Sequence, residues 1–266
     1  MFLAAAIQMT SLDEKESNVR KALALVDEAA ARNAQFVALP ENVLYMGPEK
    51  DKAMTAEPLE GPTLARFSQK AREKRIHLLA GSILESGAPG GRFFNTSALF
   101  GPDGKRLAVY RKIHLFDVDI PDGARYRESE TIAPGTEPVV AETALGRIGL
   151  SICYDLRFPE LYRALSAKGA ELLCVPAAFT AHTGKDHWEV LLRARAIENT
   201  CFVVAPAQFG KHSEKRVTYG NALIADPWGT VIARASDGEG MAVGPIDRTV
   251  LERVRREVPS LSHRRL

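Results

Sequence analysis

Short apolar runs alternate with longer amphipathic segments along the whole chain, and this alternation constrains the fold more than any other feature. The runs predict strands at residues 2–9, 36–39, 76–84, 93–100, 107–110, 147–152, 172–175, 201–205, 221–225, 231–235 and 241–246. The amphipathic segments predict helices at residues 12–32, 63–74, 159–168 and 187–199, and a basic helix closes the chain. Such an order is typical of α/β proteins, in which helices cover sheets. Since neither a repeat nor a low-complexity linker interrupts it, we expect a single domain over residues 1–266.

The composition argues against several classes of partner. The 35 Lys and Arg residues nearly balance the 33 Asp and Glu residues, so no strong positive field favours a nucleic acid. The longest apolar stretches, such as residues 172–178, are far shorter than the roughly 20 residues that span a membrane. The apolar N-terminus lacks the basic start of a signal peptide and predicts a buried first strand. We therefore expect no membrane partner either.

The cysteine and histidine residues show no pattern typical of a disulfide or metal site. Three widely spaced cysteines without a CxxC pair argue against both, and they favour a location in the reducing cytoplasm. The six histidines form no HExxH motif, and the chain has neither a Walker loop nor a GxGxxG motif after a strand. The sequence therefore predicts a metal-free protein that needs no cofactor.

Three chemically reactive side chains each follow a predicted strand: Glu41, Lys112 and Cys153. Because strand ends are where a rigid sheet meets open loops, side chains from distant parts of the chain converge there. Cys174 and Cys201 instead lie inside apolar runs, where a buried, inert thiol is expected.

The residues alone leave a cysteine-histidine pair open as well. The candidate partners of Cys153 are His114, His182 and His187, and His114 is nearest to Lys112 in the sequence.

Three sequence blocks resemble the nitrilase or carbon-nitrogen hydrolase superfamily: LPENVLYMG, YRKIHLFDVDIP and GLSICYDLRFPELYR. The resemblance extends nearly from end to end of the chain. It implies a four-layer α-β-β-α sandwich, and it implies that Glu41, Lys112 and Cys153 are catalytic. It also implies a supporting role for Glu128 in RYRESETIAPG. For this second acid the alternatives are Asp117 and Asp119 in the same segment.

These residue types suit the hydrolysis of an unactivated amide. A cysteine thiolate is a better nucleophile than water. Glu41 would take the thiol proton, pass it to the departing nitrogen and later activate a water molecule. Lys112, held as an ammonium ion by nearby acids, would face the negative charge on the carbonyl oxygen together with the backbone N–H of Tyr154.

Two later blocks are similar to the deaminated glutathione amidase branch of this superfamily: HWEVLLRARAIENTCFVVAPAQFG and KHSEKRVTYGNALIADPWGTVIARASDGEG. That branch cleaves the amide between a 2-oxoglutaryl group and cysteinylglycine, and the resemblance implies the same small-molecule substrate here. One alternative is an ω-amidase acting on 2-oxoglutaramate or 2-oxosuccinamate, which offer the same kind of acyl group. An alternative from another class is a catalytically idle, dimeric binding module, against which the three intact reactive residues count.

Arg157, Phe179 and Thr180 are candidates for substrate binding. Arg157 would meet a substrate carboxylate, or it would form a structural salt bridge with Asp155 or Glu160. Phe179 and Thr180 follow a predicted strand and would line the pocket.

Four further segments of the chain carry predictions of their own. A basic cluster would reach a second carboxylate if its loop borders the pocket; it comprises Lys211, His212, Lys215 and Arg216. Residues 113–136 show little periodicity and predict a long loop over another part of the protein. The helices at 159–168 and 187–199 carry apolar surface, from which we expect, by analogy with the superfamily, a homodimer or a higher homo-oligomer.

Overall fold

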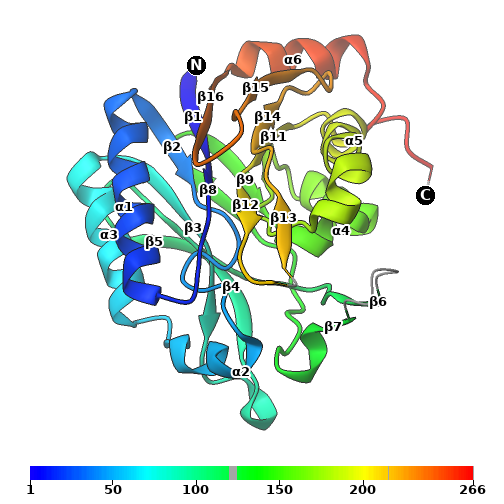
Figure 1. Ribbon diagram of the computed structural model, residues 1–266. Coiled ribbons are helices and arrows are strands. Elements are labelled where there is room, and N and C mark those ends of the chain that lie inside the picture. Colours follow the sequence, from blue (N-terminus) through cyan, green and yellow to red (C-terminus); the bar gives the residue numbers. More distant parts are fainter. Residues whose placement is uncertain (120–124, 215, 266) are drawn as a thin grey trace.

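Two β-sheets lie face to face at the centre of the protein (Figure 1). The computed structural model describes residues 1–119, 125–214 and 216–265. The first sheet has the order β13 (Val217–Tyr219), β12 (Ala207–Lys211), β1 (Phe2–Met9), β2 (Ala34–Ala38), β3 (His77–Glu85), β4 (Phe94–Phe100), β5 (Arg106–Arg111), with β16 (Gly240–Ile246) also paired to β1. The second has the order β15 (Val231–Arg234), β14 (Leu223–Ala225), β11 (Phe202–Ala205), β10 (Leu172–Cys174), β9 (Gly146–Leu150), β8 (Val140–Thr143).

Helices cover the outer face of each sheet. The α-helices are α1 (Lys15–Ala31), α2 (Glu49–Lys52), α3 (Pro62–Lys74), α4 (Pro159–Ala167), α5 (Ala181–Asn199) and α6 (Arg248–Glu257). The 3-10 helices are η1 (Ala53–Thr55), η2 (Pro89–Gly91), η3 (Glu128–Glu130) and η4 (Cys153–Arg157). Figure 1 shows α1 and α3 on one side of the sheets and α4 and α5 on the other. This is the four-layer α-β-β-α sandwich expected from the sequence, so that prediction is confirmed.

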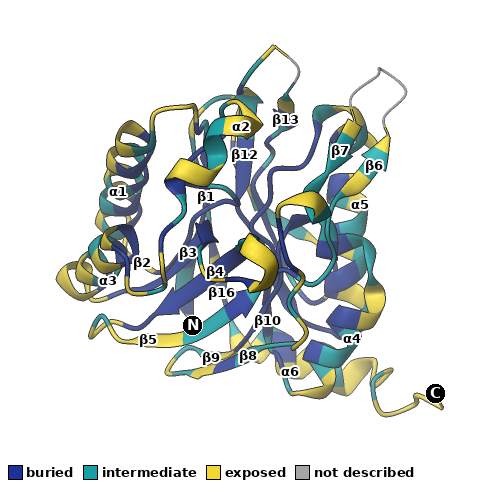
Figure 2. Cartoon of the chain, turned by 90° about the horizontal axis from the view of Figure 1, so that it is seen from below, coloured by how far each residue is buried: buried dark blue, intermediate teal, exposed yellow. Residues whose placement is uncertain are grey.

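The buried strands explain why the apolar runs lack a polar face. Along β1, Ala4 and Ala6 belong to the core between the two sheets, whereas Ala5 and Ile7 belong to the core beneath α1 and α3. A strand buried on both faces reads as a continuous apolar run. Figure 2 accordingly shows the strands as mostly buried and the outer faces of the helices as exposed.

The strand directions bring three important chain segments to one end of the sandwich. β1, β2 and β3 run parallel, and two antiparallel pairings through β4 return β5 to the same direction. In the second sheet β9, β10 and β11 also run parallel. The carboxyl ends of β2, β5 and β9 are the points after which Glu41, Lys112 and Cys153 follow.

Two helices begin elsewhere than the sequence pattern predicts. α1 begins at Lys15 and not at Leu12, because the Ser11 side chain is buried and donates a hydrogen bond to Val43 O. α5 begins at Ala181, six residues before the predicted start. Gly184 weakens the helical pattern there, but it is needed for packing, since a Cβ at this position would lie 2.3 Å from the Tyr219 side chain.

The sequence pattern did not predict several short elements. The strands β8, β12 and β13 were not predicted, and the segment 113–136 contains the hairpin of β6 (Asp117–Asp119) and β7 (Arg125–Arg127) followed by η3. α4 does not leave the apolar stripe exposed, because Leu161, Tyr162 and Leu165 are buried. Among the described residues, no helix is both long and apolar enough to cross a bilayer.

Candidate active site

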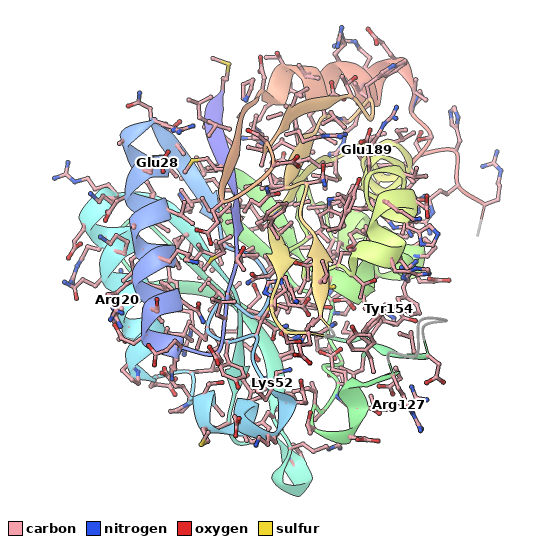
Figure 3. The ribbon with its side chains drawn as sticks, in the orientation of Figure 1. Arg20, Glu28, Lys52, Arg127, Tyr154 and Glu189 are labelled. Atoms are coloured by element: carbon pink, nitrogen blue, oxygen red, sulfur yellow. The ribbon has the colours of Figure 1, made fainter. Side chains whose placement is uncertain are left out.

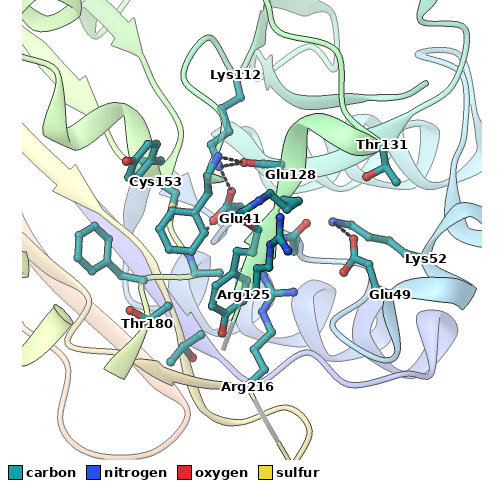
Figure 4. A pocket seen from close by; sticks show the side chains of 18 of the residues that line it. Glu41, Glu49, Lys52, Lys112, Arg125, Glu128, Thr131, Cys153, Thr180 and Arg216 are labelled. Carbon is teal, nitrogen blue, oxygen red and sulfur yellow. Dashed lines mark hydrogen bonds and ion pairs between the residues drawn. The ribbon is translucent and has the colours of Figure 1, made fainter. Parts of the chain in front are cut away.

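Glu41, Lys112 and Cys153 line one cavity, although they come from distant parts of the chain (Figure 4). Lys112 Nζ donates hydrogen bonds to Glu41 Oε1 at 3.0 Å and to Glu128 Oε2 at 2.8 Å. The Glu41 carboxylate lies beside the Cys153 thiol and interacts with it electrostatically. The backbone N–H of Ala178 donates to the other Glu41 oxygen at 2.9 Å. Glu41 thus contacts both the ammonium and the thiol.

Glu41 is held rigidly because its segment lies against the neighbouring strand. β2 ends at Ala38, and Leu39 and Pro40 lead to Glu41. A Cβ on Gly81 of β3 would lie only 2.0 Å from Pro40 O. The glycine therefore permits the close approach that fixes the position of Glu41.

Cys153 occupies a strained turn directly after β9. Its φ is 48°, in the left-handed region, where a non-glycine residue costs on the order of 1–3 kcal/mol. Its backbone N–H donates to Pro176 O at 2.9 Å, which helps to hold the turn. A sharp turn between a strand and a helix exposes a nucleophile at the end of its strand.

The charges of the buried groups follow from their contacts. Burial alone would lower the pKa of Lys112, but the Glu128 and Glu41 carboxylates raise it well above its ordinary value. Burial would raise the pKa of Glu128, but the Lys112 ammonium overcomes this effect and lowers it to about 2. Burial and the Glu41 carboxylate raise the pKa of Cys153 well above its ordinary value. The resting site therefore holds an ammonium ion and a protonated thiol.

Asn95 on β4 joins the two acids, and the sequence pattern did not reveal it. Its Nδ2 donates to Glu41 Oε1 at 3.0 Å and to Glu128 Oε1 at 3.1 Å. Its backbone oxygen accepts from Lys112 N at 2.9 Å. The one available signal was an asparagine within a predicted strand, beside Thr96 and Ser97, since a buried amide requires hydrogen-bond partners.

Of the three acids proposed to balance Lys112, only Glu128 contacts it. Asp117 accepts a hydrogen bond from Ser129 N at 3.0 Å. Asp119 is exposed and pairs with Arg127 at 2.8 Å. The hairpin of β6 and β7 holds both of these acids away from the ammonium.

The cavity has a volume of about 600 Å³, which is within the range of roughly 300–1,000 Å³ typical of small-molecule sites. Figure 3 shows Lys52, Tyr154 and Arg127, three of its lining residues, at the end of the sandwich away from α6. Among the described residues, six cationic side chains line the cavity, against the four acids Glu41, Glu49, Glu128 and Glu130: Lys112, Lys52, Arg125, Arg127, Arg157 and Arg216. An excess of positive charge around a cavity favours an anionic ligand.

Comparison with known proteins assigns the family, since residues 3–256 match the family model described as carbon-nitrogen hydrolase. The chain belongs to the carbon-nitrogen hydrolase family. It is 48% identical over 266 residues to the deaminated glutathione amidase of Synechocystis sp. (strain PCC 6803 / GT-S), covering 99% of this chain and 98% of that protein. It is 41% identical over 266 residues to an omega-amidase of Xenopus tropicalis, covering 99% and 95%.

The fold has close counterparts among solved structures as well. The crystal structure of the C. elegans NitFhit protein matches with a TM-score of 0.92 at 39% identity and covers 99% of this chain. The hydrolase spans 65% of that longer chain. The family inferred from the three sequence blocks is therefore confirmed.

The predicted substrate-binding residues of the hydrolase all line the cavity: Tyr154, Arg157, Phe179 and Thr180. The Arg157 guanidinium lies 4.9 Å from the ring centre of Phe179 and 5.9 Å from that of Tyr154. Its Nη1 is 3.3 Å from His187 Nδ1. In the described part of the chain, no salt bridge joins Arg157 to Asp155 or Glu160, so the structural alternative for Arg157 is wrong.

The basic cluster divides between the cavity and the core. Arg216 lines the cavity, and Lys211 at the end of β12 is exposed. His212 is buried, with Nδ1 2.7 Å from Ser11 O and Nε2 2.7 Å from Thr218 Oγ1. Burial lowers the pKa of His212 to about 4, so the expectation of a basic side chain there is wrong. Lys215 lies outside the described residues.

Among the described residues, the other cysteines and the histidines are not part of the cavity lining. Cys174 and Cys201 are buried, and burial raises the pKa of both thiols. His114 Nδ1 bonds to Asp155 Oδ1 at 2.7 Å, and His187 faces Arg157. Over the described ranges, no group of three or more histidine, cysteine or acidic side chains is arranged to hold a metal ion.

Proposed function

We propose that this carbon-nitrogen hydrolase is an amidase that cleaves deaminated glutathione into 2-oxoglutarate and cysteinylglycine through a thioester on Cys153. The observation that carries the proposal is the contact of one carboxylate, Glu41, with both the Lys112 ammonium and the Cys153 thiol inside a cavity. The name of the Synechocystis relative supports this choice of substrate.

The first chemical step is acylation of Cys153. Because the pKa of the thiol is raised, the sulfur attacks as Glu41 removes its proton, and no stable thiolate has to form beforehand. The carbon-sulfur bond forms, and the tetrahedral intermediate then expels the amide nitrogen. Glu41 passes the proton to this nitrogen, so that cysteinylglycine leaves as a neutral amine.

The second step hydrolyses the thioester. Glu41, again a carboxylate, removes a proton from water as the water oxygen attacks the acyl carbon. The carbon-sulfur bond breaks, the sulfur regains a proton from Glu41, and 2-oxoglutarate is released. One carboxylate therefore serves both steps, in agreement with its position between the ammonium and the thiol.

The negative charge on the carbonyl oxygen faces two donors in both steps. Lys112 Nζ is fixed by two carboxylates and retains its proton, as its raised pKa requires. Tyr154 lies in the first turn of η4, where backbone N–H groups have no partner within the helix. Donors held in place before the reaction stabilise the transition state without reorganisation.

The cavity supports a substrate with two carboxylates. Deaminated glutathione carries one on its 2-oxoglutaryl end and one on its glycyl end. We assign the first to Arg157, which lies beside Tyr154 next to the nucleophile, and the second to Arg216 at the rim. Phe179 and Thr180 line the wall near Arg157.

The second candidate is an ω-amidase acting on 2-oxoglutaramate or 2-oxosuccinamate, and the Xenopus relative favours it. These amides have about half as many non-hydrogen atoms as deaminated glutathione, so they leave much of the 600 Å³ cavity unfilled. The ratio of kcat/KM for the two kinds of substrate decides between them. A catalytically idle binding module would hydrolyse neither kind of substrate.

One experiment tests reaction class and acyl preference together. The protein is incubated with deaminated glutathione, 2-oxoglutaramate, simple nitriles and carbamoylated amines, and intact mass spectrometry follows acyl adducts on Cys153. We expect a 2-oxoglutaryl adduct that disappears as product forms. Turnover that persists after stoichiometric alkylation of Cys153 contradicts the proposal.

The proposal also covers the domain organisation, the location and the oligomeric state of the protein. We infer a single domain, supported by the pairing of β1 with β16, which joins strands from the two ends of the chain in one sheet. We also infer a cytoplasmic enzyme, with which three free thiols agree. Finally we infer a homodimer through α5, where Val190 and Ile197 are exposed and Ile197 lies against Gly229, the residue after the exposed Trp228.

Light scattering tests the dimer. Ile197→Glu places a charge in the exposed apolar surface of α5 and should convert the dimer to a monomer. A wild-type protein that is monomeric at micromolar concentration contradicts the inference.

A further inference from the structure

Asp155 is a fully buried carboxylate that accepts hydrogen bonds on both of its oxygens. It follows the nucleophile by two residues. Its Oδ2 accepts from Ile152 N at 2.9 Å and from the Tyr110 hydroxyl at 2.6 Å. Its Oδ1 accepts from the backbone N–H of His114 at 3.0 Å and contacts His114 Nδ1 at 2.7 Å.

These partners bracket Lys112. Tyr110, on β5, lies two residues before Lys112, and His114 lies two residues after it. Asp155 itself lies within η4, whose first residue is Cys153. One carboxylate therefore fixes the chain on both sides of the ammonium and fixes the turn that carries the sulfur.

Ring contacts strengthen the same junction. The His114 ring stacks on Phe158 with centroids 3.7 Å apart and an angle of 6° between the planes. Phe116 meets Tyr154 edge to face at 5.0 Å. Both contacts join the segment after Lys112 to the segment after Cys153.

A directional link is needed at this point because the two sheets meet mainly through apolar side chains. Lys112 follows a strand of the first sheet, and Cys153 follows a strand of the second. Apolar packing has no preferred direction and tolerates small displacements, whereas hydrogen bonds to a buried carboxylate fix distance and angle. Misplacement of a reacting group by about 1 Å can cost on the order of 100-fold in rate.

We propose that Asp155 is a positioning residue that holds the Lys112 ammonium and the Cys153 sulfur in register across the two sheets. The proposal rests on the function proposed above, because register matters only if these two groups act on one carbonyl. Asp155 touches neither the sulfur nor the ammonium in this role. It acts through Tyr110, His114 and the η4 turn.

The test uses two variants that keep the shape of the junction. Tyr110→Phe removes the phenol hydrogen bond, and His114→Phe removes the imidazole hydrogen bond but retains a ring to stack on Phe158. The matched control is Tyr45→Phe. Tyr45 is another buried tyrosine, whose hydroxyl donates to Pro48 O at 3.1 Å, and no bond joins it to Asp155 or to the Lys112 segment among the described contacts.

We expect each junction variant to lower kcat by about tenfold to 100-fold with KM unchanged, since ground-state contacts to the substrate remain. The rate at which iodoacetamide alkylates Cys153 should also fall at neutral pH, and its rise with pH should move to higher pH. The physical reason is that a displaced ammonium stabilises the thiolate less. Tyr45→Phe should follow the wild type in both measurements.

The two measurements separate this proposal from the proposed function. If the wild type hydrolyses no amide but the junction variants still shift the alkylation profile, the function fails and the positioning role stands. If the wild type turns over and both variants keep its kcat and its alkylation profile, the positioning role is overturned. A lower Tm with wild-type kcat in the folded variants overturns it as well, because it leaves Asp155 a purely structural role.

Discussion

The base of the cavity and its rim carry similar charges in different surroundings. At the base, Lys112 and Glu41 are 2% and 3% exposed, and in the described part of the chain their side chains bond to one another, to Asn95, to the Ala178 backbone and to Glu128, which is 12% exposed. At the rim, Lys52 pairs with Glu49 at 3.3 Å, and the Glu49 side chain is 60% exposed. Exposed ion pairs contribute about 0–1 kcal/mol, whereas breaking a buried pair costs about 3–5 kcal/mol.

This difference assigns separate tasks to the two regions. Groups at the base are held rigidly at strand ends, which suits the chemical steps, where small displacements cost much rate. Groups at the rim lie on α2, on the hairpin of β6 and β7 and on the segment before β13. Such positions suit recognition of the far end of a substrate. Substitutions at the base should therefore change kcat, and substitutions at the rim should change KM.

The largest effect is expected for Cys153→Ala. It removes the proposed nucleophile, and kcat should fall by more than about 10⁴-fold, to the level of the uncatalysed reaction. The measurement is the steady-state rate of hydrolysis of deaminated glutathione. Circular dichroism spectra of the variant and the wild type check that both are folded. Cys174→Ala is the control, because this thiol is buried in β10 and should leave kcat unchanged. Equal losses in the two variants would contradict the proposed role of Cys153 as the nucleophile.

Glu41→Gln should lower kcat by about 10²- to 10⁴-fold, the range for loss of a general base. The amide retains the shape of the side chain but accepts no proton, so both acylation and deacylation should slow. Single-turnover kinetics with intact mass spectrometry separates the two steps. Fast acylation followed by a long-lived adduct would show that Glu41 serves only the second step.

The Glu128→Gln variant tests how much the charged Glu128 at the base of the cavity contributes to the free energy of unfolding. This contribution depends on pH. The folded pKa of about 2 is below the ordinary 4.5, so the charged form of Glu128 stabilises the fold above about pH 4.5. This contribution is lost as the pH falls from 4.5 towards 2. At neutral pH the variant should lose about 3 kcal/mol of unfolding free energy, and the difference from the wild type should shrink at pH 3.

Urea denaturation at the two pH values measures this change. Glu130→Gln is the control, because it removes an exposed carboxylate two residues further along the chain. A loss for Glu128→Gln that is the same at both pH values would contradict an origin in the Lys112 ion pair.

The base was predictable from the sequence because local patterns determine it. Apolar runs specify β2, β5 and β9, and the reactive residues Glu41, Lys112 and Cys153 follow these strands within a few positions. Strand direction then brings their ends together. The resemblance of three sequence blocks to one family added the roles, and the layered fold confirmed the architecture that it implied.

Other parts of the site depend on contacts between segments that no local pattern encodes. Asn95 resembles any polar residue in a strand until its amide is seen between two acids. Asp155 lies two residues before Arg157 in the sequence, but its side chain binds Tyr110 and His114 instead. His212 belongs to a basic run, yet its side chain is buried between two oxygen atoms. In each case tertiary burial, and not neighbouring charge, decides the role.

The smallest effect is expected at the rim, for Arg216→Ser. In the described part of the chain no ion pair occupies the Arg216 guanidinium, and it lines the cavity, where we assign it the glycyl carboxylate. A charge-assisted hydrogen bond in a partly exposed site contributes about 1.4 kcal/mol, so KM for deaminated glutathione should rise about tenfold with kcat unchanged. KM for 2-oxoglutaramate, which lacks the second carboxylate, should not change. Lys211→Ser removes an exposed cation outside the cavity lining and should affect neither substrate. A lower kcat for both substrates in Arg216→Ser would mean that the rim takes part in the chemistry, and the separation between base and rim would then be wrong.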